Sequence, residues 1–136
     1  MPSQTSCNIV VVERCGRIIL RRNIECNAAG SRYVKPAATT EHIVKLNRAR
    51  VRFSGGNLAG DFTNAVEIGL SSKIINDSTN LLAMSFSLAS GTFSGRVLDP
   101  GSQKSKSFAG AILQKFNVGY GMLLGTNLSS EVEFVP

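Results

Sequence analysis

Along the chain after residue 48, large apolar residues alternate with small or polar ones, which is the pattern of strands that bury one face. The clearest example is the segment 82–89, in which leucine, methionine and phenylalanine alternate with alanine and serine. Clusters of Gly, Asn, Asp, Ser and Pro separate the alternating segments and predict turns. The strands that this pattern predicts are 48–53, 63–70, 82–89, 92–98, 107–116, 120–124 and 131–134.

Short strands joined by tight turns predict an all-β fold, namely an antiparallel meander that forms a β-sandwich or a partly closed small barrel. The segment 28–41 is not expected to be a helix, because it contains Gly30 and Pro36 and lacks a continuous apolar stripe. At 136 residues the chain has the length of one domain. The predicted core consists of Val51, Phe53, Phe62, Val66, Ile68, Leu82, Met84, Phe86, Leu88, Phe93, Val97, Phe108, Ile112, Tyr120, Leu124 and Phe134.

A short motif, Phe-Ser/Ala-Gly followed by Leu three residues later, begins at Phe53, Phe93 and Phe108. Within a strand, its Phe and its Gly lie on the same face, because they are two residues apart. A strand glycine leaves a gap that an aromatic ring from a neighbouring strand can cover. The unequal spacing of the three copies is not that of a regular repeat. We therefore interpret the motif as core packing.

Charge and cysteine divide the chain into two regions. Of the 15 Lys and Arg residues, ten lie in 1–52 together with all three cysteines and the only histidine, although only three of the nine acids do. This break predicts a basic, cysteine-containing segment 1–44, whose origin the sequence leaves open, and an all-β module 45–136. The apolar runs 9–12 and 18–20 are candidate edge strands of the same sheet. We nevertheless expect the module to fold without residues 1–44.

The candidate metal ligands and nucleophiles are Cys7, Cys15, Cys26 and His42. No two of the cysteines form the C-x₂-C pair typical of a zinc site. Their odd number excludes complete pairing into disulfides and leaves open one bridge with one free thiol. The sequence also lacks the G-x-S-x-G nucleophile elbow and the phosphate-binding loop. We therefore expect no enzymatic activity, no cofactor and no metal site.

The candidate binding residues are Arg48, Arg50 and Arg52 on one face of a predicted strand, with Lys45 extending the row. Guanidinium groups about 7 Å apart can match successive phosphates or acidic sugars. Aromatic rings do not accompany them, because Phe53 faces the other way, so base stacking is poorly supplied. The alternative is that the charges protect an edge strand from pairing with another chain.

Two spaced segments carry a family resemblance: F-A-G-A-I-L-Q-K at 108–115 and G-Y-G-M-L-L-G-T-N at 119–127. The segments 53–58 and 93–100 contribute further matches. Together they resemble the closing module of large bacterial secreted and surface proteins that carry β repeats, over residues 45–136. Met122 stands where that family usually has an aromatic residue. The resemblance implies an all-β accessory module with no assigned chemistry, located outside the cell or on its surface.

The expected function is that of a non-enzymatic structural or adhesion module of a larger surface or secreted protein. The alternative is a small basic β-barrel that binds nucleic acid or another polyanion, supported by the basic first region. The expected partners are other domains of a parent protein, a second copy paired through an edge strand, or a polyanion. No segment is apolar enough to span a membrane. Residues 1–7 lack the pattern of a secretory signal, so a complete, free-standing chain would be cytoplasmic.

Overall fold

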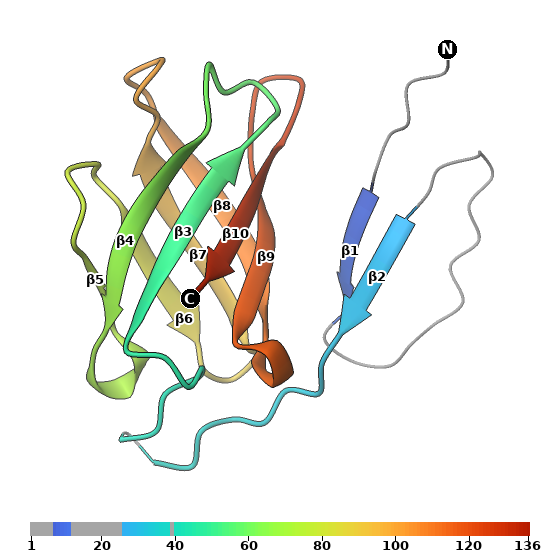
Figure 1. The fold of residues 1–136 in the computed structure, drawn as a ribbon, viewed down its shortest axis with the longest axis vertical. Coiled ribbons are helices and arrows are strands. Elements are labelled where there is room, and N and C mark those ends of the chain that lie inside the picture. Colours follow the sequence, from blue (N-terminus) through green and yellow to red (C-terminus); the bar gives the residue numbers. More distant parts are fainter. Residues whose placement is uncertain (1–6, 12–25, 39) are drawn as a thin grey trace.

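Figure 1 shows the computed structural model of the chain, which describes residues 7–11, 26–38 and 40–136, with side chains from residue 30 onward. Eight strands form one sheet in the order β5-β4-β3-β10-β9-β8-β7-β6. In chain order these strands are β3 (Arg48–Ser54), β4 (Phe62–Ile68), β5 (Ile74–Asn76), β6 (Ala83–Ser87), β7 (Thr92–Leu98), β8 (Ser105–Leu113), β9 (Val118–Leu123) and β10 (Ser130–Val135). Two short 3₁₀ helices, η1 (Leu70–Ser72) and η2 (Gln114–Phe116), lie between strands.

Every pair of neighbouring strands in this sheet is antiparallel, which confirms the predicted all-β fold. The sheet curls until its two edge strands, β5 and β6, approach each other without pairing. The fold is therefore a nearly closed barrel rather than a sandwich of two sheets (Figure 1).

The strands predicted after residue 48 all occur, with shifted ends, and one strand of the barrel was not predicted. Strand β5 has three residues, too few to show a period of two. In the basic first region, β1 (Cys7–Val11) and β2 (Cys26–Gly30) pair in parallel as a separate two-stranded sheet. Residues 9–11 of the apolar run predicted at 9–12 thus belong to this small sheet and not to the barrel, and Val12 lies outside the described residues. The run at 18–20 lies outside the described residues.

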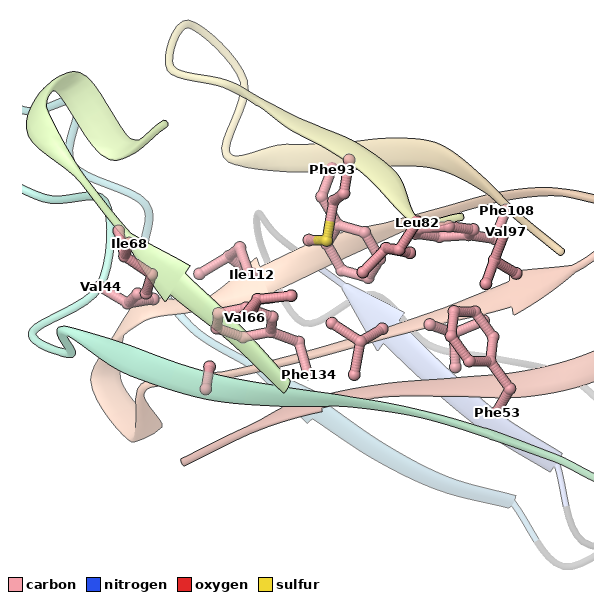
Figure 2. Close-up of a cluster of buried hydrophobic side chains, with 14 of the residues drawn as sticks. Val44, Phe53, Val66, Ile68, Leu82, Phe93, Val97, Phe108, Ile112 and Phe134 are labelled. Carbon is pink, nitrogen blue, oxygen red and sulfur yellow. The ribbon is translucent and has the colours of Figure 1, made fainter. Parts of the chain in front are cut away.

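The barrel interior holds the core, where side chains from opposite parts of the wall meet (Figure 2). Strand β3 alternates between exposed arginines and buried Ala49, Val51 and Phe53, as its sequence predicts. The residues buried below one-tenth exposure in this core are Ile43, Val44, Ala49, Val51, Phe53, Val66, Ile68, Leu82, Met84, Phe93, Val97, Phe108, Ile112, Leu123, Val132 and Phe134. Phe62, Phe86 and Leu88 are only partly buried and pack against it.

Two predicted core residues, Tyr120 and Leu124, are in fact directed outward. Tyr120 is partly buried and Leu124 is 64% exposed, whereas Leu123 is fully buried. The error comes from reading the largest side chains of β9 as its inner face. The inner positions before Leu123 are glycines, and a Cβ on Gly119 would lie 2.9 Å from the ring of Phe93. The ring of Phe93, from β7 on the far side of β8, fills the space that the glycine leaves.

Strands β7 and β8 confirm the packing interpretation of two motif copies. Their register pairs Phe93 with Gly110 and Gly95 with Phe108, so each ring lies over the glycine of the other strand. A Cβ on Gly95 would lie 2.8 Å from the ring of Phe108, and a Cβ on Gly110 would collide with the ring of Phe93. The third copy is different, because its glycine, Gly55, lies in a turn at φ +71° with open space around it.

The segment 31–47 runs across one end of the barrel, at the bottom of Figure 1, and closes it. Ile43 and Val44 are each 1% exposed and belong to the core. The Tyr33 hydroxyl donates a 2.6 Å hydrogen bond to the Leu88 carbonyl, and its ring lies against Gly91. The predicted boundary at residues 44 and 45 therefore falls inside a segment that supplies part of the core.

Candidate functional site

Arg48, Arg50 and Arg52 face outward from β3, as predicted, and each has a polar partner. The guanidinium group of Arg48 lies 2.9 Å from a carboxylate oxygen of Glu67. Arg52 lies 3.4 Å from Asp61 and 3.7 Å from Glu133. Arg50 instead donates hydrogen bonds of 2.9 and 3.2 Å to the carbonyl oxygen of Pro136.

Sheet register explains these ion pairs. Arg48 is directly opposite Glu67 of β4, and Arg52 is directly opposite Glu133 of β10. Opposite charges in such cross-strand positions attract one another. Because β3 is paired on both sides, the interpretation of its arginines as protection of a sheet edge is wrong. The edges of the sheet are β5 and β6.

Lys45 does not belong to β3. It lies in the segment that closes the barrel end, where its backbone N–H donates a 2.9 Å hydrogen bond to Oδ1 of Asn117. The structure thus brings the three arginines together on one strand and places Lys45 beside η2. Neighbouring carboxylates compensate much of the arginine charge, which makes this row a weaker attractor for a polyanion than the sequence suggests.

The outer faces of β6 to β9 form a second kind of surface, which we call the uncharged wall. Cross-strand register places Ser85, Ser94, Ala109 and Met122 in one row of this wall. A parallel row contains serine, threonine, alanine and tyrosine. Arg96 is the only charged residue among its positions. The outward residues of the wall are Ala83, Ser85, Ser87, Thr92, Ser94, Arg96, Leu98, Ser105, Ser107, Ala109, Ala111, Tyr120, Met122 and Leu124.

An apolar ridge follows β9 along the uncharged wall. It consists of Tyr120, Met122 and Leu124, and the last two side chains are 60% and 64% exposed. Small side chains of β8, Ala109 and Ala111, lie directly beside it. A ridge of large apolar residues next to a flat field of small ones is suited to packing against another protein surface. A visible sequence signal was overlooked, because residues 78–95 contain no charged residue.

One ion pair is buried, in the loop that joins β7 to β8. The side chain of Asp99 is 3% exposed and lies 2.9 Å from Nζ of Lys106. It also accepts hydrogen bonds from the Ser102 hydroxyl at 2.7 Å and from the Gly101 N–H at 3.0 Å. Burial alone would raise the pKa of Asp99, but these hydrogen bonds and the Lys106 charge outweigh it and lower the pKa to about 2. All of these partners belong to the same hairpin, so we assign the pair a structural role.

The candidate metal ligands are not brought together as a site among the described side chains. Where side chains are described, no three His, Cys, Asp or Glu residues gather in a way that would hold a metal ion. His42 lies with Nδ1 at 3.3 Å from the Leu46 carbonyl oxygen. Cys7 and Cys26 are register partners in β1 and β2, and Cys15 is outside the described residues. Within the described part of the chain, no helix has the length and apolar character needed to cross a membrane.

Comparisons with protein-family models, with curated proteins and with solved structures give no match to this chain. The surfaces of the barrel therefore carry the functional inference. The two candidates are the arginine row of β3, with its neighbouring carboxylates, and the uncharged wall of β6 to β9.

Proposed function

We propose that this chain is a non-enzymatic structural and adhesion module of a larger surface or secreted protein. The uncharged wall is the observation that carries this proposal. Soluble proteins usually intersperse charges over exposed sheet faces, because charges keep them apart in solution. A wall of four strands with a single charged residue suits contact with another folded surface.

The interior of the barrel supports the same proposal. Its centre is filled by rings such as Phe53, Phe93 and Phe134, each at most 2% exposed. Side chains that fill a small barrel leave the outer surface as the place for interactions. The motifs that resemble bacterial surface proteins point to the same kind of role.

The partner that we propose is the uncharged wall of a like module, whether in the parent protein or in a second copy of this chain. Sheets pack face to face when small and large side chains interdigitate. The ridge of Tyr120, Met122 and Leu124 can fit against the small residues Ser94 and Ala109 of a copy turned about a twofold axis. Such an interface would be isologous, with the same patch used on both sides.

Sedimentation velocity of the purified chain over a range of concentrations tests this proposal. We expect the chain to form dimers reversibly and Met122→Glu to remain monomeric, because the variant places a charge at the centre of the apolar ridge on β9. The matched control is Ala65→Glu, which adds the same charge to the outer face of β4, opposite Arg50. Dimerisation that is absent from the wild type, or lost equally in both variants, would contradict the proposal.

A further inference from the structure

The end of the barrel that segment 31–47 closes carries a group of exposed cations. They lie on three segments that meet there: the closing segment itself, the loop around η1, and η2. We call this surface the basic end. Its cations are Arg32, Lys35, Lys45, Lys73 and Lys115, all of them exposed.

Hydrogen bonds to η2 hold the backbone next to these cations. The Lys115 N–H donates to the Ser31 hydroxyl at 3.1 Å, which places Arg32 beside η2. The Gln114 side chain bonds both the N–H and the carbonyl of Val34, at 2.8 and 3.0 Å, next to Lys35. The bond from Lys45 to Asn117 places a further cation at the end of η2. Four cations are thus grouped around one short helix.

Lys73 joins the group from the other side of the closing segment. The Ile43 N–H donates a 2.8 Å hydrogen bond to the hydroxyl of Ser72, the residue before Lys73. The closing segment is therefore tied to η1 as well as to η2. The cations project from a backbone that these contacts order, so their spacing depends on the fold and not on a disordered tail.

The basic end differs from the arginine row because nearby carboxylates do not compensate its charge. In the part of the chain that the structure describes, none of its five cations forms an ion pair. The only acid on the three segments is Glu41, which accepts a hydrogen bond from the Ala37 N–H at 2.9 Å. Uncompensated, exposed cations attract anions over a range of about 10 Å at ordinary salt.

An exposed aromatic ring lies beside one of these cations. Phe116, the last residue of η2, is 52% exposed, and Nζ of Lys115 lies 5.7 Å from the centre of its ring. Val34, also exposed, is held nearby by Gln114. A ring among cations is what the arginine row lacks, and it can stack on the face of a sugar or of a base.

We infer that the basic end binds an acidic polysaccharide, with Arg32, Lys35, Lys45, Lys73 and Lys115 contacting its anionic groups and Phe116 contacting a sugar ring. This inference names a ligand for the proposed adhesion role, and rests on that role. A single ring cannot stack on successive bases, which is how proteins usually hold single-stranded nucleic acid. Repeated charge with one stacking contact fits a charged sugar polymer better.

Heparin oligosaccharide is a suitable probe, with oligo-dT and polygalacturonate as comparison ligands. Two triple variants, each with three fewer positive charges, are compared with the wild type by titration at several salt concentrations. The first variant replaces Lys35, Lys45 and Lys115 with glutamine. The second is the matched control, Arg48→Gln, Arg50→Gln and Arg52→Gln. Phe116→Ala tests the ring separately.

We expect the lysine triple to bind heparin at least tenfold more weakly at low salt and to reduce the log–log salt slope by about 2–3. The arginine triple should weaken binding less than threefold, and Phe116→Ala should weaken binding to both glycans. An equal loss in both triples would show a net-charge effect and overturn the inference. Tighter binding of oligo-dT than of both glycans would overturn it in favour of nucleic acid.

The same samples separate this inference from the proposed docking of the uncharged wall. The lysine triple should form dimers like the wild type, whereas Met122→Glu should bind heparin normally. A wild-type chain that dimerises but shows no salt-dependent affinity for heparin or polygalacturonate would contradict the basic end alone. Circular dichroism melts of each variant show whether the barrel remains folded, so that a loss of binding is assigned to the site.

Discussion

The two walls of the barrel contribute to one aromatic core but have opposite exteriors. Strands β3, β4 and β10, which we call the charged wall, present arginines interleaved with glutamates, and the uncharged wall of β6 to β9 presents mainly serine, alanine and one apolar ridge. Both walls bury phenylalanine, at Phe53 and Phe134 on one side and at Phe93 and Phe108 on the other. The difference in charge between them lies in their outward-facing residues.

This comparison separates stability from function. Cross-strand ion pairs on an exposed face contribute little to folding, and they keep that face solvated. Small uncharged residues contribute equally little, but they leave the face free to pack against another surface. The charged wall is thus the solvated side of the barrel, and the uncharged wall is the side suited to contact with another protein surface.

The largest loss of stability is expected from deleting the segment that closes one end of the barrel. Deleting residues 1–44 removes Ile43 and Val44 from the core, which should lower the free energy of unfolding by about 3–6 kcal/mol. Deleting residues 1–29 leaves both side chains and the contacts of Tyr33 in place, so we expect a cooperative urea transition close to that of the whole chain. If both truncated proteins are equally stable, the closing segment contributes nothing to the core.

The next largest loss of stability is expected from removing the ring of Phe93, which covers glycines of the uncharged wall. Phe93→Ala should cost about 3–5 kcal/mol, because the ring is 2% exposed and covers Gly110 and Gly119. Phe86 is central in the most regular alternating segment, but it is only partly buried. Phe86→Ala should therefore cost less. Urea denaturation of both variants checks the order, and a larger loss for Phe86→Ala would contradict the assignment of the core.

The ion pair of Asp99 and Lys106 predicts a dependence of stability on pH. Because the pKa of Asp99 is lowered to about 2 in the folded chain, its carboxylate stabilises the fold above the ordinary pKa near 4. That contribution, about 2 kcal/mol, is lost as the pH falls through 2. Asp99→Asn should be less stable at pH 7 by a similar amount and should lose less stability on acidification. Thermal melts from pH 7 to pH 2 measure both.

The smallest change in stability is expected from substitutions on the charged wall. Arg48→Gln removes an exposed pair with Glu67, and we expect no measurable change in the urea midpoint. Its matched partner, Glu67→Gln, should behave in the same way. A clear loss in either variant would mean that the charged wall contributes to folding, and the separation of stability from function would fail.

Much of the barrel could be predicted from the sequence because strand alternation is a local pattern. The alternation of arginine with Ala49, Val51 and Phe53 gave the correct faces of β3. Local pattern failed at β9, because the identity of its inner face depends on the ring of Phe93, which lies far away in the sequence. It also failed for Ile43 and Val44, which are buried only because the closing segment crosses the barrel end.

The site was less predictable than the fold. Arg48, Arg50 and Arg52 were correctly placed on one outer face, but their carboxylate partners lie on β4 and β10, and strand register is not visible in a local window. The uncharged wall combines four strands, so its extent could not be seen before the strand order was known. Grouping of cations around η2 likewise depends on contacts between residues about 70 to 80 positions apart.

Hydroxyl-radical footprinting at low and high protein concentration tests the central claim, that the uncharged wall is the contact surface, most directly. Met122 and Tyr120 lie on that wall, and Phe116 on the basic end provides an internal control. We expect oxidation of Met122 and Tyr120 to fall at high concentration and oxidation of Phe116 to stay constant. Concentration-independent oxidation of Met122, or protection of Phe116 instead, would contradict the claim.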